Sequence, residues 1–327
     1  MSTPGSESSI LTPVDSEACR PTRDQRQTVN RFNKFILGDS YIKDAAKLYP
    51  LSREQAKKRN TDFDVVERVH ESEKKLLKSP PDPAHSLEVT LEPNDYTDEK
   101  FKLFANYQRV VHHEPPHKIN KTSFKNFLCT SPIPASTATF DGRERKLGSY
   151  HQCYRIDGKL VAVGVLDLLP QCVSAVYFMY HEEVHRHGFG KLAAIREIAL
   201  AKEEGYPWWY AGFYIHSCAK MKYKADYTPQ YLLDPESYTW NLLDDTLKSH
   251  LDTSKYFSLS AHSHSQPQSN PTPTTTPSSS SLPTSSPPSS HPLSPPPPSH
   301  PSQSSSVQLP SQASSPSPNS SPPTSQP

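Results

Sequence analysis

The sequence has few cysteines, and their arrangement argues against two common kinds of site. The five cysteines among 327 residues are widely spaced, form no Cys-x-x-Cys pair and are odd in number. Neither a zinc knuckle nor a disulfide framework is therefore indicated. No apolar run reaches the roughly 18–20 residues of a membrane span, and residues 1–20 are too polar for a signal peptide. We expect a cytoplasmic protein that binds no membrane, with the nucleus as an alternative compartment.

The last part of the chain, 261–327, lacks the residues that build a core. It contains no Lys, Arg, Asp, Glu, Phe, Tyr or Trp, and consists almost entirely of Ser, Pro, Thr, Gln and His. Such a segment cannot bury enough apolar surface to offset the entropy lost on ordering. We predict a disordered Ser/Pro-rich tail that is a passive extension, with a phosphorylatable or partner-binding tail as the alternative.

Charge is nearly balanced over the whole chain but not locally. The formal net charge is +1, whereas residues 20–59 hold eleven Lys or Arg against four Asp or Glu. This stretch suits a phosphate-bearing partner. A solvated helix surface explains it equally well.

A leader and a helix are predicted at the start of the chain. Residues 1–20 are expected to be disordered. Thr22 and Gln25 have the spacing of a capping box and precede the apolar residues of a helix over 23–37, which ends at Gly38.

The region 21–121 is predicted to be helical as a whole. Within it, 39–95 combines proline breaks with many charges, which favours a mobile charged insert over a core element. A further helix is expected behind Thr97 as its cap. Its predicted buried face consists of Phe101, Phe104, Ala105, Gln108 and Val111.

Strands dominate the next region, 122–260. Alternating or continuous apolar residues predict strands over 149–156, 159–169, 173–180 and 208–215, and a helix over 188–204. Asp157-Gly158 indicates a type I′ hairpin turn. The order implies a mixed sheet with a crossover through the helix, so we predict an α/β (α+β) fold with a GNAT-type acyltransferase core. Fold alone leaves the substrate open.

Two blocks of this region resemble a known family closely. Residues 150–167 read YHQCYRIDGKLVAVGVLD, and residues 212–224 read GFYIHSCAKMKYK. They are similar to the C-terminal half of eukaryotic arginyl-tRNA–protein transferases, as are 172–177, 196–199 and 227–240. The resemblance is dense from about 122 to 256 and weaker over 20–38.

The resemblance implies an activity and its partners. Members transfer arginine from arginyl-tRNA to the α-amine of proteins with N-terminal Asp or Glu, which marks them for N-degron-dependent degradation. Arginyl-tRNA would be the co-substrate, and DNA is not an expected partner. The family's N-terminal segment carries cysteines implicated in cofactor binding, and this sequence starts after it. We therefore expect no cofactor bound by this chain, and impaired transfer.

Aminoacyl transfer starts from an activated ester, so it needs positioning and proton transfer and no metal. Asp167 is the first catalytic candidate, because a lone carboxylate in an apolar strand requires a partner; a structural hydrogen bond is the alternative. His151 and Gln152 are further candidates, although neighbouring strand residues face opposite sides. Tyr177, in a matched block, completes the catalytic set.

Binding candidates follow the last aromatic strand. Lysines with an interleaved tyrosine suit a phosphate backbone and a stacked terminal base, whereas an ordinary exposed loop is the alternative. The predicted tRNA-binding residues are Tyr214, His216, Lys220, Lys222, Tyr223 and Lys224, with Arg23 and Arg26 of the basic helix.

Two other functions remain open. In the stretch 185–190, HRHGFG, a Gly-x-Gly at a helix start could bind a pyrophosphate, which would suit an acyl-CoA-dependent N-acetyltransferase. A third possibility is an inactive module that binds tRNA or acidic N-termini.

Overall fold

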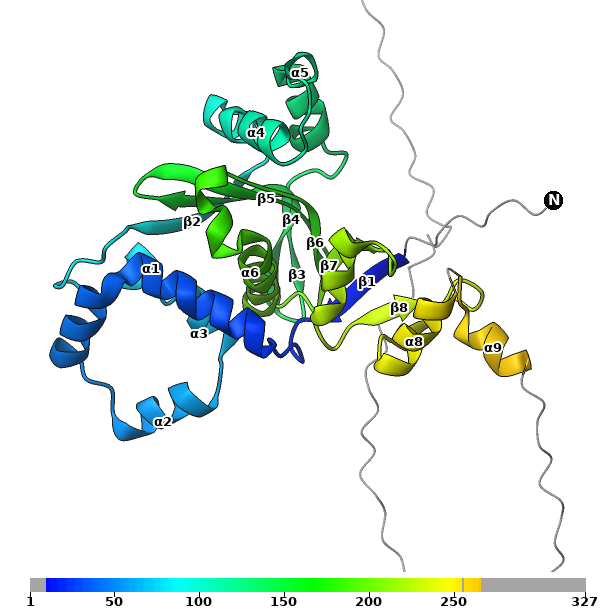
Figure 1. The fold of residues 1–327 in the computed structure, drawn as a ribbon, viewed down its shortest axis with the longest axis horizontal. Helices are drawn as coiled ribbons and strands as arrows, with labels where there is room; N and C mark the ends of the chain where they lie inside the picture. Colours follow the sequence, from blue (N-terminus) through cyan, green and yellow to red (C-terminus); the bar gives the residue numbers. More distant parts are fainter. Residues whose placement is uncertain (1–9, 255, 266–327) are drawn as a thin grey trace, which may run out of the picture. The chain divides into compact units, whose positions relative to one another are not determined.

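The protein folds around a mixed seven-stranded sheet (Figure 1). The computed structural model describes residues 10–254 and 256–265. The strand order is β1-β7-β6-β5-β4-β2, and β3 also pairs with β4. The strands are β1 (Ile10–Asp15), β2 (Leu87–Pro93), β3 (Ser136–Phe140), β4 (Arg143–Ile156), β5 (Lys159–Leu169), β6 (Cys172–Tyr180) and β7 (Trp208–Tyr214). Strands β8 (Tyr231–Leu233) and β9 (Trp240–Leu242) form a separate pair. The predicted α/β class with a mixed sheet is confirmed.

Helices cover both faces of this sheet. They are α1 (Arg23–Leu48), α2 (Arg53–Thr61), α3 (Val65–His70), α4 (Asp98–Val110), α5 (Lys121–Phe124), α6 (Phe189–Glu204), α7 (Ala219–Lys222), α8 (Asp245–Thr253) and α9 (Leu259–Ser265). Helices α4 and α5 lie on one face, and α6 lies on the other with α1 and α3 (Figure 1). Among the helices described, none is both long and apolar enough to cross a membrane.

Local sequence signals position the central strands as predicted. Asp157 and Gly158 have φ of 52° and 79°, the signs that a type I′ turn requires, and they join β4 to β5. Helix α6 ends at Gly205, whose φ is 80°. The strands on either side of α6, β6 and β7, are parallel, so the predicted crossover is confirmed.

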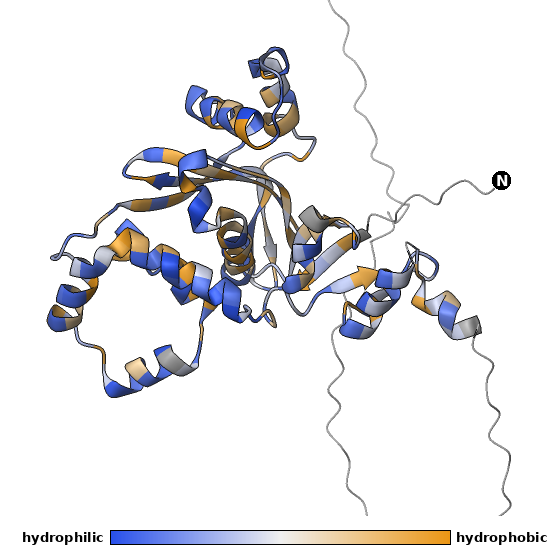
Figure 2. Ribbon diagram, viewed as in Figure 1, coloured by the Kyte–Doolittle hydropathy of each residue, from blue (hydrophilic) through white to orange (hydrophobic). Residues whose placement is uncertain are grey.

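Two apolar clusters hold the layers together. One contains Leu166 and Leu168 of β5 with Ile195 and Ile198 of α6. The other lies under α4 and α5 and includes Phe104, Phe124 and Val163. Figure 2 shows hydrophobic residues concentrated in α6 and the central strands, whereas α2 is hydrophilic. Truncating a buried leucine here should cost about 2–5 kcal/mol of stability.

The first described residues differ from the predicted disordered leader. Strand β1 pairs antiparallel with β7, and Val14 is fully buried. Pro13 lies at an irregularity in the pairing, and β1 is an edge strand. Proline obscured the strand pattern in the sequence, although an edge strand or bulge tolerates its missing N–H. Residues 1–9 lie outside the described part of the chain.

Strand β2 and helix α3, both within the segment 39–95, pack on the core, so this part of the segment is not a mobile insert. Strand β2 pairs with β4 along its whole length, and Val65 and Val69 of α3 join the cluster below α6. Arg196 Nη1 donates to Val69 O at 2.8 Å. The proposed boundary at 121/122 therefore divides one sheet. Short elements with few apolar residues each gave too weak a periodicity for prediction.

Two further expectations need correction. The buried residues of α4 are Lys100, Leu103, Phe104 and Gln108, while Val111 is 36% exposed. At the other end, α9 extends the fold to Ser265, because Asp234 accepts hydrogen bonds from Ser260 N at 3.1 Å and from Ser258 Oγ at 3.0 Å. The predicted tail thus starts after this helix at the earliest, and 266–327 lie outside the described residues.

Candidate functional site

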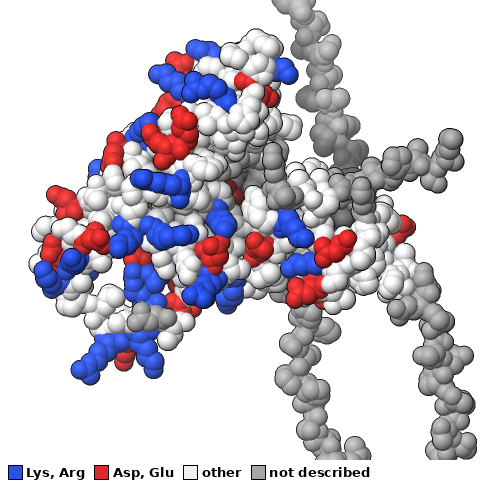
Figure 3. All heavy atoms as spheres, in the orientation of Figure 1, with Lys and Arg blue, Asp and Glu red and all other residues white. Residues whose placement is uncertain are grey.

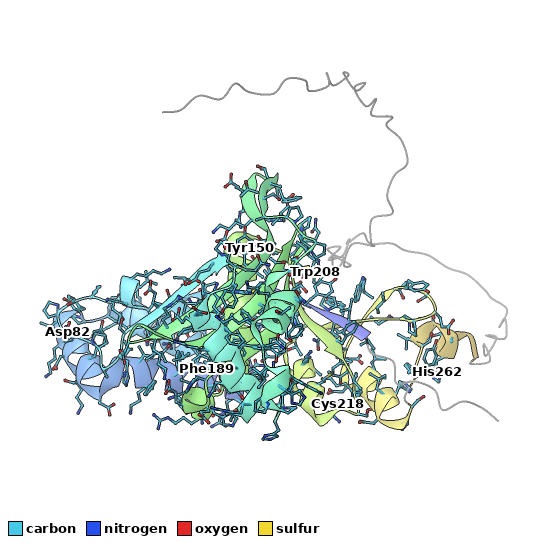
Figure 4. The ribbon with its side chains drawn as sticks, turned by 90° about the horizontal axis from the view of Figure 1, so that it is seen from above. Asp82, Tyr150, Phe189, Trp208, Cys218 and His262 are labelled. Carbon is cyan, nitrogen blue, oxygen red and sulfur yellow. The ribbon has the colours of Figure 1, made fainter. Side chains whose placement is uncertain are left out.

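A cleft opens where the parallel strands β6 and β7 separate. They pair only from Cys172–Trp208 to Ser174–Tyr210, after which the register ends. Beyond that point the strands, with α6 below them, enclose about 700 Å³. Gly212 of β7 has φ of 78°, a backbone conformation that residues other than glycine rarely adopt. Figure 4 labels Phe189 at the start of α6 and Cys218 just after β7, the two segments that border the cleft.

Glu197 of α6 is a buried carboxylate in the wall of this cleft. It is 3% exposed, and Trp209 Nε1 donates a hydrogen bond to its Oε2 at 2.9 Å. Burial raises its pKa to about 7, and the bond from Trp209 opposes this shift. Among the side chains that the structure describes, no basic group forms an ion pair with it. Our sequence reasoning missed this residue, although a lone carboxylate within a helix buried on all sides was a usable signal.

Aromatic rings line the opposite wall. Tyr177 Oη accepts from Gln108 Nε2 at 3.1 Å and lies 3.1 Å from His112 Nε2. Tyr107 makes edge-to-face contacts with Tyr177 and Tyr180, with ring centroids 6.2 and 5.2 Å apart. Burial raises the pKa of Tyr177, so its hydroxyl stays protonated at neutral pH. The wall is therefore rigid and offers hydroxyl donors.

A second, basic pocket adjoins the cleft at the start of α6. It encloses about 510 Å³ and shares Gly190 and Tyr223 with the cleft. Its basic lining residues are Arg31, Arg186, His187 and Lys191. The N-cap of α6 is a glycine, which brings no capping side chain, so the first-turn N–H groups are not capped from that position. A helix N-terminus with nearby cations attracts anions such as phosphate.

Contacts from α1 shape this basic pocket. The rings of Phe35 and His187 lie 4.2 Å apart, and the Arg186 guanidinium lies 5.7 Å from the Phe35 centroid. Burial and the neighbouring Arg186 lower the pKa of His187. Lys191 pairs with Asp24 of α1. Helix α1 therefore positions one side of the pocket.

The predicted catalytic residues do not gather in one place. Tyr177 lines the cleft. Asp167 is half-buried on β5 and accepts a hydrogen bond from Ser149 Oγ, outside the cleft lining. Gln152 Oε1 accepts from Tyr154 Oη at 2.7 Å. His151 is fully buried on the other face of β4 and is held by the main chain.

The surroundings of His151 explain its titration. Its Nε2 lies 2.9 Å from the carbonyl oxygen of Leu128, below α5. Burial lowers its pKa to about 4 despite this bond. The imidazole is thus neutral at physiological pH and has no access to the cleft.

The predicted binding residues divide into two groups. Tyr223 and Lys224 line the cleft, and Lys224 Nζ donates to Phe213 O at 2.9 Å. Burial lowers the pKa of Lys224. His216 and Lys222 instead contact Asp252 of α8, at 2.7 and 3.5 Å.

The other binding candidates lie apart from the cleft. Tyr214 is buried, with its Oη 2.5 Å from His216 Nδ1. Arg23 and Arg26 are exposed on the first turns of α1, and the side chain of Lys220 lies outside the described part of the chain.

The described part of the chain holds no cluster of metal-ligating side chains and no disulfide. Within it, no three His, Cys, Asp or Glu side chains are grouped so as to hold a metal ion. The five thiols form no disulfide. Burial raises the pKa of Cys153 and Cys172 to about 12, so both stay protonated near neutral pH.

The cleft lies within a region that matches a known family. Residues 99–234 match the family described as "Arginine-tRNA-protein transferase, C terminus". This stretch is therefore similar to the C-terminal part of arginyl-tRNA–protein transferases. The match covers most of α4, β3 to β7 and every cleft residue named above, whereas the α1 residues of the basic pocket lie outside it.

Individual transferases are similar to the chain over much of the same region. Arginyl-tRNA–protein transferase 1 of Drosophila melanogaster is 41% identical over 163 residues, which are 48% of this chain and 33% of that protein. The Arabidopsis thaliana protein of the same name is 38% identical over 189 residues, 55% of this chain and 30% of that one. The chain thus spans about a third of the length of these relatives.

More distant similarities include a bacterial protein and a solved structure. An aspartate/glutamate leucyltransferase of Pseudomonas fluorescens (strain Pf0-1) is 32% identical over 142 residues, 42% of this chain and 53% of that protein. The C-terminal domain of a putative lysylphosphatidylglycerol synthetase from Agrobacterium fabrum is 13% identical, with a TM-score of 0.32, over 63% of this chain and 47% of that one. A structural similarity this low carries no argument about function.

Proposed function

We propose that this protein transfers arginine from arginyl-tRNA to the N-terminal α-amine of acceptor proteins. The observation that carries the proposal is a pair of adjoining cavities, lined mainly by the matched residues 99–234: a basic pocket at a helix N-terminus and the cleft, which share Gly190 and Tyr223. Acceptors with N-terminal Asp or Glu, and a role in N-degron-dependent degradation, belong to the same proposal. So does a GNAT-type acyltransferase core, which the β6-α6-β7 crossover with separating strands supports.

In this proposal the two cavities bind different parts of one substrate. The terminal phosphates of the tRNA lie against Arg186, Arg31 and the first turn of α6. Tyr223, shared by both cavities, contacts the terminal adenosine. The aminoacyl ester then enters the cleft. This division suits a ligand that is anionic at one end only.

The chemistry requires little beyond positioning. The ester is already activated, and an acceptor α-amine with a pKa of about 8 is partly neutral near physiological pH. Its attack forms a tetrahedral oxyanion, which hydroxyl or main-chain N–H donors stabilise. Tyr177 supplies a hydroxyl, and main-chain groups on the facing edges of β6 and β7 lose their mutual pairing beyond Ser174.

Basic residues outside the cavities would extend the tRNA surface. Arg53, Lys57 and Lys58 are exposed on α2, and Figure 3 shows Lys and Arg gathered over that helix. Such a surface gives sequence-independent, salt-sensitive binding to a phosphate backbone.

The second candidate function is acyl-CoA-dependent N-acetylation. The N-terminus of α6, which has no side-chain cap, could bind the pyrophosphate of an acyl-CoA. A single-turnover assay separates the two functions. The purified chain, in excess, is incubated with radiolabelled arginyl-tRNA or labelled acetyl-CoA and with peptides that begin with Asp, Glu or Gly. We expect arginine on the Asp and Glu peptides and no acetyl label.

Two outcomes would contradict this proposal. Acetyl transfer without arginine transfer would identify the acyl-CoA enzyme. Tight binding of arginyl-tRNA with no transfer to any peptide would identify an inactive binding module. Arg186→Ala should weaken both binding and transfer, whereas the exposed, distant His117→Ala should change neither.

A further inference from the structure

The cleft contains a buried carboxylate for which the described side chains provide no cationic partner. Glu197 is 3% exposed, and its pairing consists of a neutral hydrogen bond from the Trp209 indole. Moving a carboxylate out of water is unfavourable unless a positive charge or several donors compensate. An ionised Glu197 is therefore complementary to a cation that enters the cleft.

The basic groups around the cleft do not occupy this position. Lys224, which lines the same cavity, donates instead to the Phe213 carbonyl at 2.9 Å. Lys191, one turn and a half before Glu197 on α6, pairs with Asp24 on α1. The cations at the start of α6 thus serve the basic pocket, and the carboxylate faces the cleft without them.

The carboxylate lies close to the sheet. Gly164 of β5 lies next to it, and a Cβ at this position would be only 3.3 Å from Glu197 Oε1 and 3.6 Å from the Phe178 ring. A side chain at residue 164 would therefore crowd both groups. Glycine therefore allows Oε1, the oxygen that does not accept from Trp209, to lie close to the main chain of β5.

Aromatic faces surround the same space. Trp209, Phe178 and Tyr223 line the cleft with Glu197. A planar guanidinium binds a carboxylate through two parallel N–H donors and also stacks on aromatic rings. A carboxylate at the base of an aromatic cleft thus favours a guanidinium over a neutral side chain of equal size.

We propose that Glu197 is the specificity-determining residue that binds the guanidinium of the transferred amino acid and selects a cationic aminoacyl group. This inference rests on the proposed function, because it assigns the aminoacyl group to the cleft. The terminal phosphates occupy the basic pocket, and the side chain of the amino acid extends from the ester toward Glu197.

The test uses citrulline, which has the shape of arginine but a neutral urea in place of the guanidinium. Arginine methyl ester and citrulline methyl ester are titrated into the full chain, and binding is followed by the indole N–H signal of Trp209 in NMR spectra. We expect the arginine ester to bind about 10–100-fold more tightly, the range for a hydrogen-bonded charge pair. Glu197→Gln should abolish this preference and leave affinity for the citrulline ester unchanged.

Glu204→Gln is the matched control, because Glu204 is an exposed carboxylate near the end of the same helix. It should retain the preference. In Glu197→Gln, the glutamine oxygen can still accept the hydrogen bond from Trp209. Thermal unfolding of this variant is measured alongside to establish that it folds. Equal affinity of the wild-type chain for both esters would overturn the inference. Equal loss of both esters in a folded Glu197→Gln variant would also overturn it.

The assay also separates this inference from the proposed function. The chain could bind the arginine ester selectively through Glu197 and yet transfer no arginine from tRNA. This result would contradict the proposed transferase function and support the role of Glu197. Arginine transfer without discrimination between arginyl- and citrullyl-tRNA would support the function and contradict the pocket. The same Glu197→Gln variant should transfer arginine and citrulline at similar rates.

Discussion

At the scale of single residues, two buried groups with opposite pKa shifts contribute to the pH dependence of stability. His151 is fully buried below α5, and Glu197 is buried below the cleft. Burial disfavours the charged form of each, so it lowers the pKa of the imidazole and raises that of the carboxyl group. The contribution of His151 to the free energy of unfolding is therefore lost as the pH falls, and that of Glu197 is lost as the pH rises.

The first prediction concerns acid stability. The folded pKa of His151 is about 4, below the roughly 6.5 of an unfolded histidine. Its neutral form thus stabilises the fold above pH 6.5, and this contribution is lost as the pH falls through 4. His151→Gln should lose less free energy of unfolding between pH 7 and 4.5 than the wild-type protein does, by an amount on the order of 2 kcal/mol. Urea unfolding at both pH values measures this, with the exposed His117→Gln as control. Parallel losses in all three proteins would contradict it.

The second prediction concerns the protein without a bound ligand at higher pH. The folded pKa of Glu197 is about 7, against the usual 4.5, so its contribution is present below pH 4.5 and is lost as the pH rises through 7. Without a bound cation, Glu197→Gln should be more stable than the wild-type protein at pH 8, by an amount on the order of 3 kcal/mol, and similar to it at pH 4.5. Chemical unfolding at the two pH values is the measurement. A destabilised variant at pH 8 would show that the carboxylate already has a cationic partner.

The sequence predicted some cleft residues and missed Glu197, for a physical reason. Tyr177, Tyr223 and Lys224 were identified because they lie in distinctive blocks next to predicted strand ends. Glu197 lies in the middle of a helix, and its importance depends on the separation of β6 and β7, which are distant from it in sequence. Whether Asp167 has a role in transfer stays a prediction.

At the scale of elements, glycine conformation decides the course of α1. Its helical path breaks at Gly38, where φ is 78° and ψ is 157°. A Cβ at this position would lie 2.7 Å from that of Ala84, and the main chain of Ala84 bonds to Leu37 O at 2.9 Å. The predicted end of the helix at Gly38 is therefore confirmed. The renewed helix after it was not predicted, because it depends on contacts with residues far along the chain.

The third prediction follows from this break. Gly38→Ala should destabilise the protein by about 2 kcal/mol or more, because alanine is strained at positive φ and would also clash with Ala84. Gly190→Ala is the comparison, since a Cβ there meets nothing within 4 Å and the residue lies within α6. That change should be neutral or slightly stabilising. Thermal unfolding of both variants would reveal any exception.

Long-range pairing explains which elements the sequence could not reveal. The hairpin β4–β5 and the β6-α6-β7 crossover have local turn, cap and periodicity signals, and they were predicted. Strands β1 and β2 are short, and each pairs with a strand that is distant in sequence, β7 and β4 respectively. Their stability comes from those partners, so their own residues carry a weak signal.

At the scale of the whole molecule, ion pairs connect α3 and the residues that follow it to α6. Arg196 of α6 pairs with Glu73, which is 1% exposed, and His70 Nε2 lies 2.6 Å from Glu203 Oε1. Removing one partner of a buried pair leaves an uncompensated charge. Arg59 of α2 pairs with Glu71 in the same segment, which links α2 to α6, as the proposed continuous tRNA-binding face would require.

The last prediction tests that continuity. If α2 contacts the tRNA backbone, the logarithm of the binding constant should fall linearly with the logarithm of salt concentration, because bound phosphates release counterions. Neutralising both Lys57 and Lys58 with alanine should then reduce the magnitude of the slope by about 2, as each duplex phosphate contact contributes about 0.9. Lys121→Ala removes an exposed lysine that pairs with Asp98 beside α4, on the other face of the sheet, and should leave the slope unchanged. The measurement is tRNA binding by fluorescence anisotropy from about 50 to 200 mM salt. An unchanged slope in the double variant would exclude α2 from the interface, and the basic stretch would then be an ordinary solvated helix surface.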